Sequence, residues 1–230
     1  MDPALQIVLL WVAFAATHMG MSSLQLRPKL VGVLGDAGFA GVYSIVALAI
    51  FVPLVSIYWG HKHQGAMLYP LVRATPWVWL QYLVMLDSMT LLVAGVTKAS
   101  PAAMTKPGAT PDPSTMVVGG VQRITRHAVF MSVGLLGLAH LMVNPFATDV
   151  AFFGGMAVFA VAGSMHQDSR KRVTLGEPYV RFTEETPLLP FGGGLAQTWQ
   201  GIRETPIWVL VVGVVLTVGL RVYHGALFSG

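Results

Sequence analysis

The sequence predicts an all-α protein, an integral membrane bundle of about six transmembrane helices in which residues 1–230 form a single domain. Composition is the first reason: 54% of the residues are hydrophobic and only 10% are charged, with a mean hydropathy of +0.66. A soluble domain carries about 25% charged residues. The second reason is that the apolar residues fall into runs of about 20, which is the length that a helix needs to cross a bilayer.

Six apolar runs are candidate spans, and each is long enough to cross the hydrocarbon layer as a helix. They cover residues 4–23, 38–59, 76–97, 126–146, 148–166 and 206–225. The fourth and fifth runs meet at NPFATD, which predicts a tight helical hairpin. Thr205 and Pro206 open the sixth run, and this pair is typical of an N-cap followed by the first helical position.

The basic residues predict the direction of these spans, because lysine and arginine concentrate in cytoplasmic loops. With six spans, eleven lysines and arginines fall on the side of the odd-numbered loops, and three fall on the other side: Lys62, Arg73 and Arg221. This bias places loops 99–122 and 167–205 in the cytoplasm and both termini on the outer (periplasmic) side. Loop 99–122 is rich in proline and glycine, which predicts irregular structure. Loop 167–205 is expected to lie at the membrane surface and to pack against the helix ends.

Composition also excludes several kinds of site. The chain has no cysteine, so it has no disulfide, no thiolate metal site and no cysteine nucleophile. The formal net charge is only +4, and the basic residues stand between apolar runs. We therefore interpret them as determinants of topology and expect no nucleic-acid partner. The partner that the composition predicts is the lipid bilayer.

Three ionisable residues lie inside the predicted spans: His18, Asp87 and His140. Such residues are costly in a bilayer and are functional candidates by default. Neutral imidazole is a common metal ligand, and two histidines from different helices suit a single heme iron. The alternatives are structural: a buried histidine can donate to a backbone carbonyl, and Asp87 can be protonated or bonded to a neighbouring hydroxyl.

His127 and His140 cannot hold one iron from opposite sides. They are 13 residues apart, which on a helix is about 20 Å along the axis and about 140° around it. We interpret Arg123, Arg126 and His127 as a basic group at the cytoplasmic interface, suited to lipid phosphates, an anionic substrate or heme propionates. The remaining histidines are weaker candidates in exposed loops or near helix ends: His61, His63, His166 and His224.

Three stretches resemble the NnrU family of bacterial membrane proteins, in order and over nearly the whole chain. They are RITRH followed by an apolar helix ending in AH, THMGMSSLQLRPKLVGVLGDAGFAGVYSIVAL, and LGEPYVRFTEETPLLPF. The resemblance implies a multi-pass protein of the bacterial inner (plasma) membrane. It also implies a link to nitric oxide and nitrite reductase systems, and so to denitrification.

The family is related to the plant 15-cis-zeta-carotene isomerase, a membrane enzyme that uses heme b to isomerise a cis double bond. The heme-binding histidines of that relative fall where His18 and His140 stand here. The relative also has a cysteine three residues before the second histidine, where this chain has Gly137, so the resemblance does not carry a ligand-switching redox mechanism over. Ala128 replaces the proline that usually follows the RH pair in the family.

The leading hypothesis is therefore a heme b membrane protein acting in redox, isomerase or nitric oxide chemistry on an apolar or small-gas substrate. His18 and His140 would ligate the iron, and Asp87 would orient a ligand or relay a proton. Propionates would pair with Arg123, Arg126 and Arg170. The predicted topology places His18 and His140 at depths that differ by about 12 Å, so His18 with His127 is a second possible pairing.

Two other functions remain open at this point. RITRH and GEPYVRF also resemble, more distantly, the membrane methyltransferases that act on isoprenylcysteine and use S-adenosylmethionine, with Glu184 and Glu185 as candidate acids. A non-catalytic accessory or transport protein is also compatible with short loops and a single buried acid.

Overall fold

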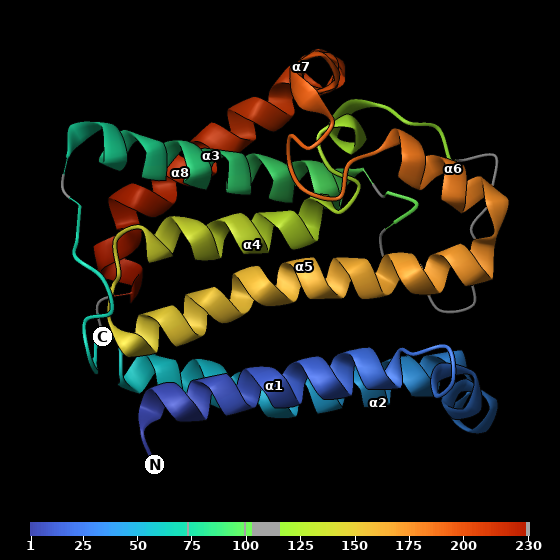
Figure 1. Cartoon of the computed structure of the whole chain (residues 1–230), viewed down its shortest axis with the longest axis horizontal. Coiled ribbons are helices and arrows are strands. Elements are labelled where there is room, and N and C mark those ends of the chain that lie inside the picture. The colour runs from blue at the N-terminus through green and yellow to red at the C-terminus, as the bar shows by residue number, and fades with distance from the viewer. Residues whose placement is uncertain (73, 99, 103–115, 229–230) are drawn as a thin grey trace.

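The computed structural model describes residues 1–72, 74–98, 100–102 and 116–228, and this part of the chain is built from helices, as predicted (Figure 1). Its elements are α1 (Pro3–Met21), α2 (Arg27–Gly60), α3 (Thr75–Thr97), the 3₁₀ helix η2 (Gly120–Arg123), α4 (Ala128–Leu141), α5 (Ala147–Leu175), α6 (Glu177–Glu185), α7 (Gly194–Glu204) and α8 (Ile207–Phe228). Most of the expected loop 99–122, together with Arg73 and Lys106 of the charge bias, lies outside the described residues.

The long helices lie side by side, and Figure 1 shows both termini at the same end of the bundle and α6 at the other. We call these the terminal end and the distal end. Neighbouring helices pack in the spatial order α2, α1, α5, α4, α3 and α8. This order places α4 and α5 at the centre, where each has a helix on both sides.

Five helices are long and apolar enough to cross a membrane: α1, α2, α3, α5 and α8. Their outward faces carry many exposed large apolar side chains, such as Val33 on α2 and Val222 on α8, which are 85% and 69% exposed. Such faces fit a lipid bilayer, because apolar side chains that face lipid are not exposed to water. The chain is therefore a helical membrane protein.

The fourth predicted span, 126–146, is longer than the helix that forms there. α4 has 14 residues, about 21 Å of helix against about 30 Å of hydrocarbon. The residues just before α4 are not helical, because the Arg126 N–H donates to the Pro187 carbonyl at 3.0 Å. At the other end, the Asn144 side chain donates to the His140 carbonyl at 2.9 Å. Pro145 follows Asn144, and a residue before proline disfavours the helical conformation.

Two other spans extend beyond their predicted bounds. α5 was predicted over 148–166 and continues to Leu175, for 29 residues, or about 43 Å. Gly176 ends it with φ of 65°, a conformation that glycine adopts without strain. α2 begins at Arg27 instead of residue 38, and Gly35, with φ of 69°, kinks it between the added segment and the predicted span.

The predicted loop 167–205 is largely helical. Beyond the last turns of α5 it contains α6 and α7. α6 buries Tyr179 and Phe182 against Ala102, and α7 packs on η2. Packing against the ends of other helices was expected, whereas this helical content was not.

Small residues allow the central helices to approach closely. A Cβ added at Gly137 of α4 would lie 2.5 Å from the Phe153 carbonyl oxygen of α5. One added at Gly155 of α5 would lie 2.1 Å from Trp11 Nε1 of α1. Close backbone approach through small residues is a common means of helix association in membranes. The position where the plant relative has a cysteine is thus one where this structure has no room for a side chain.

We expect Gly137→Ala to destabilise the protein by about 1–3 kcal/mol, the range for adding volume to a closely packed site. Gly154→Ala on the same helix pair is the control, because a Cβ there would meet nothing within 4 Å. Thermal unfolding of the detergent-purified proteins measures the difference. Equal midpoints for the two variants would contradict the packing described here.

Candidate functional site

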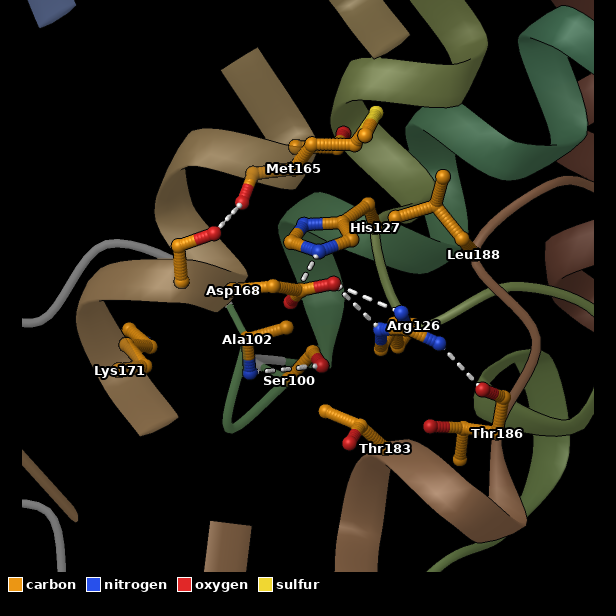
Figure 2. Close-up of polar contacts among 12 residues, drawn as sticks. Ser100, Ala102, Arg126, His127, Met165, Asp168, Lys171, Thr183, Thr186 and Leu188 are labelled. Atoms are coloured by element: carbon orange, nitrogen blue, oxygen red, sulfur yellow. Dashed lines mark hydrogen bonds and ion pairs between the residues drawn. The ribbon is translucent and has the colours of Figure 1, made fainter. Parts of the chain in front are cut away.

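A buried ion-pair network occupies the distal end of the bundle, around Asp168 of α5 (Figure 2). Arg126 donates to Asp168 Oδ2 through Nε at 2.9 Å and Nη2 at 2.7 Å. His127 Nε2 lies 2.8 Å from Oδ1, which also accepts from the Tyr179 hydroxyl at 2.7 Å. These four residues are at most 7% exposed, and both oxygens of the Asp168 carboxylate accept hydrogen bonds inside the protein.

The RITRH segment reaches this position because it is hydrogen-bonded to the bends and turns that follow α6. Thr125 Oγ1 donates to the Leu188 carbonyl at 2.6 Å, and the Ile124 carbonyl accepts from the Phe191 N–H at 3.1 Å. Arg126 Nη1 also donates to the Thr186 carbonyl. The segment is therefore held between α5 and residues 186–191, with its side chains directed inward.

Tyr179 connects α6 to the same carboxylate. The phenol is completely buried, and burial, together with the hydrogen bond to the Asp168 carboxylate, raises the pKa of Tyr179. The hydroxyl therefore stays protonated and acts only as a donor across the range in which proteins fold. It attaches a surface helix to the end of a membrane helix.

Arg123 belongs to a separate ion pair. Its Nε donates to Glu204 Oε2 of α7 at 2.9 Å, and the Gly120 N–H donates to the same oxygen at 2.8 Å. Arg123, the Gly120 N–H and the Gln200 amide lower the pKa of the Glu204 carboxyl from 4.5 to about 2. The predicted basic group of Arg123, Arg126 and His127 is thus divided between two carboxylates.

The two partners, Asp168 and Glu204, were not predicted from the sequence. Asp168 stands in HQDSRKR, a stretch dominated by basic residues and interpreted as a determinant of topology. One signal was present: it is the acid nearest the end of the fifth apolar run. By contrast, the candidate acids Glu184 and Glu185 are exposed, and the described contacts of Arg126 and His127 do not include them.

His18 lies near the distal end of α1, in an aromatic environment. Its ring stacks on Phe14 with centroids 5.1 Å apart and contacts Tyr43 and Phe159. Its Nδ1 is buried and has no hydrogen-bond partner among the described residues. His166 of α5 is close enough for its charge to act on His18.

His140 lies near the terminal end, at the last turn of α4. Its Nδ1 is 2.8 Å from the Leu136 carbonyl oxygen, and its ring stacks on Phe153 with centroids 4.4 Å apart. A carbonyl only accepts, so Nδ1 carries the proton and the neutral ring has its lone pair at Nε2. The ring of His224, on α8, lies beside it with centroids 6.3 Å apart.

The structure does not bring His18 and His140 together. The two rings contact Phe159 and Phe153 of α5 respectively. Those positions are about 9 Å apart along a helix and about 120° apart around it. The described contacts do not join the rings of His18 and His127 either: His127 is bonded to Asp168 through Nε2 and its ring lies beside Phe130. His224, one of the four histidines given less weight from the sequence, is the histidine beside His140.

Asp87, the third intramembrane candidate, is partly exposed on α3 and accepts no hydrogen bond from the described residues. Its neighbour Ser88 is fully buried and donates to the Ser132 carbonyl of α4 at 2.7 Å. Asp87 is therefore not in contact with any of the histidines described above.

A second buried carboxylate, Asp149, was missed by sequence reasoning. It is fully buried at the terminal end of α5 and accepts from the Tyr58 hydroxyl at 3.0 Å. His63 Nδ1 lies 3.0 Å from its other oxygen. His63 was expected to be exposed, and its side chain is 55% exposed, but one ring nitrogen is held by Asp149. Its φ of 57° is unusual for a residue other than glycine.

A family model described as NnrU protein matches residues 6–229. The chain belongs to the NnrU family. No curated protein matches it, and no solved structure does. The RITRH segment, His18 and His140, which carried the resemblance in the sequence, all lie within the matched range, as do Asp168 and His224.

This member of the NnrU family also has an apolar groove of about 530 Å³ between α4 and α5. Gly134, Leu138, Ala157 and Val161 line it, together with Leu189 from the stretch after α6. The described residues contain no group of three or more histidine, aspartate or glutamate side chains placed to hold a metal ion.

We expect Asp168→Ala to destabilise the protein by about 3–5 kcal/mol, because Arg126 and His127 would stay buried without a counter-charge. Ser169→Ala is the control, since Ser169 is the exposed neighbour and bonds only the Met165 carbonyl. The midpoint of thermal unfolding in detergent is the measurement. A loss no larger than that of the control would mean that the network contributes little to folding.

Glu204 gives the protein a pH dependence with a definite sign. Its folded pKa, about 2, lies below the unfolded value of 4.5, so its stabilising effect is complete above pH 4.5 and is lost as the pH falls toward 2. Glu204→Gln should remove this component and flatten the stability curve between pH 5 and pH 3. Thermal midpoints across that range measure it, and parallel curves for both proteins would disprove it.

Proposed function

We propose that this chain is a heme b protein of the bacterial inner membrane in which His140 and His224 ligate the iron. The observation that carries the proposal is the pair of imidazole rings on α4 and α8, 6.3 Å apart between centroids. Both termini would then lie on the outer side, as the distribution of basic residues predicts, and the heme would lie near the outer face.

The donor chemistry of His140 supports a ligand role. Its Nδ1–H is held by the Leu136 carbonyl at 2.8 Å, which fixes the tautomer and the ring direction. Metal-bound histidines usually donate their other ring N–H to a carbonyl or carboxylate in this way.

The spacing of the two rings is compatible with ligation of one metal. A nitrogen ligand lies about 2.0 Å from a metal, so two imidazole rings with centroids 6.3 Å apart would be close enough to hold one metal ion together. His224 is exposed on the outward face of α8, which leaves its ring nitrogens accessible from the bilayer. A flat, largely apolar cofactor would reach this position from the lipid side.

Lys62 is a cation close to this site, whereas Arg123 and Arg126 lie at the distal end (Figure 1). Lys62 Nζ donates to the Phe228 carbonyl at 2.7 Å, and the Phe228 ring is 5.0 Å from that of His224. Arg123 and Arg126 already bind Glu204 and Asp168. Lys62 is therefore the group that would meet a propionate.

A heme here would supply one-electron chemistry or the binding of a small gas. The chain's own residues would hold the group and admit substrate from the bilayer rather than from water. An apolar or small-gas substrate suits that route, and nitric oxide suits the denitrification link that the family resemblance implies. Whether the reaction is a redox reaction or an isomerisation would depend on which substrate enters from the bilayer.

The test is an absorption spectrum of the detergent-purified protein, expressed with heme supplied. We expect a Soret band in the wild type and a fall in bound heme of at least about tenfold in His140→Ala and in His224→Ala. His61→Ala is the matched control, because His61 makes the same local bond, Nδ1 to the Ile57 carbonyl at 2.9 Å.

His18→Ala separates the two possible pairings. It should leave the Soret band unchanged if His140 and His224 hold the iron. If His18→Ala loses heme while His224→Ala keeps it, the pair implied by the plant relative is correct and the pair proposed here is wrong. A wild-type protein without any Soret band would overturn the heme proposal itself.

A further inference from the structure

A group of basic side chains lies where α1, α2 and α5 meet at the distal end. We call Arg27, His166 and Arg170 the interfacial basic cluster. Arg170 Nη1 donates to the Ser22 carbonyl at 3.0 Å, and His166 Nε2 lies 3.1 Å from Ser22 Oγ. Ser22, between α1 and α2, thus attaches two members of the cluster to the first helical hairpin.

The cluster has no carboxylate partner among the described residues. Arg123, Arg126 and Arg181 each form an ion pair, whereas Arg27 and Arg170 form none there. Arg27 is instead near the Phe39 ring, 5.5 Å from its centroid. Arg27 and Arg170 are near enough for their charges to act on each other. Two partly buried cations held together in this way favour an anion between them.

His18 adds a second unsatisfied group beside the cluster. Its buried Nδ1 has no partner among the described residues, and the hydroxyl of Tyr43 next to it donates to the His18 carbonyl at 3.2 Å. A buried polar nitrogen without a partner costs free energy. A ligand with oxygen atoms, bound beside His18, could supply the hydrogen-bond partner that His18 Nδ1 does not have among the described residues.

Apolar side chains continue from the cluster along the outside of α2. Leu24, Leu26, Val33 and Leu34 are exposed to between 39% and 85%. The first turn of α2, which begins at Arg27, also presents the positive end of a helix dipole. A ligand that fits both parts has a negative head and a hydrocarbon tail.

We propose that the interfacial basic cluster binds the phosphate of an anionic phospholipid, with its acyl chains against the exposed apolar face of α2. Arg170 and Arg27 would contact the phosphate oxygens, and His166 would donate at the edge of the site. This site is at the opposite end of the bundle from His140 and His224 and is independent of whether heme binds.

The test uses the full-length protein in detergent, with thermal midpoints recorded against added lipid. Phosphatidylglycerol should stabilise the wild type saturably, and phosphatidylcholine or inorganic phosphate should not at the same concentration. Arg170→Gln should weaken the apparent affinity for phosphatidylglycerol about tenfold or more. Arg181→Gln, which removes an exposed arginine paired with Glu177, is the matched control and should behave as the wild type.

If Arg170→Gln fails to fold, Arg27→Gln gives the same readout, because the Arg27 side chain makes no hydrogen bond or ion pair with the described residues and its backbone N–H bond to the Ser23 carbonyl would be kept. Equal stabilisation by inorganic phosphate would overturn the lipid as the source of the anion. Unchanged affinity in the arginine variants, or the same loss in Arg181→Gln, would overturn the site.

Discussion

The carboxylate of Asp168 is the point on which the distal end of the bundle depends. It lies on a membrane helix and bonds three side chains from two distant segments, Arg126, His127 and Tyr179. Arginine stays charged in proteins, so an arginine that is 7% exposed requires a counter-charge inside the fold. Asp168 supplies it, and in doing so it fixes where α4 can begin and where α6 must lie.

This constraint explains which parts of the fold could be predicted from sequence. The long apolar runs predicted α1, α3 and α8 nearly to their ends, because hydropathy reports what the bilayer requires. α4 was predicted too long because Arg126 and His127 border an apolar run, and hydropathy does not show that both bind Asp168 outside the helix. α5 was predicted too short for the complementary reason: its charged last turns are helical because they pack on α6 and the RITRH segment.

The candidate site divides in the same way. His18 and His140 were identified singly, since an ionisable group in an apolar run is visible in one dimension. Their pairing depends on the directions of side chains from different helices, which a single sequence does not contain. His224 was undervalued because it stands near the end of the chain, yet α8 places its ring 6.3 Å from that of His140. Asp168 was missed because its neighbours are basic.

The arginines show how far a count of charges can be taken. The count gives a direction for the spans, and for that purpose every arginine in a loop is equivalent. In the structure they differ: Arg126 is neutralised inside the protein and Arg123 is paired near its surface, whereas Arg170 has no carboxylate partner among the described residues and lies near Arg27. Only a residue of the third kind can attract an external anion without first breaking an internal ion pair, which costs more the deeper that pair is buried. The arginines that the sequence suggested as an anion site, Arg123 and Arg126, are thus already paired with carboxylates. The interfacial basic cluster, which has no carboxylate partner among the described residues, lies instead near His18.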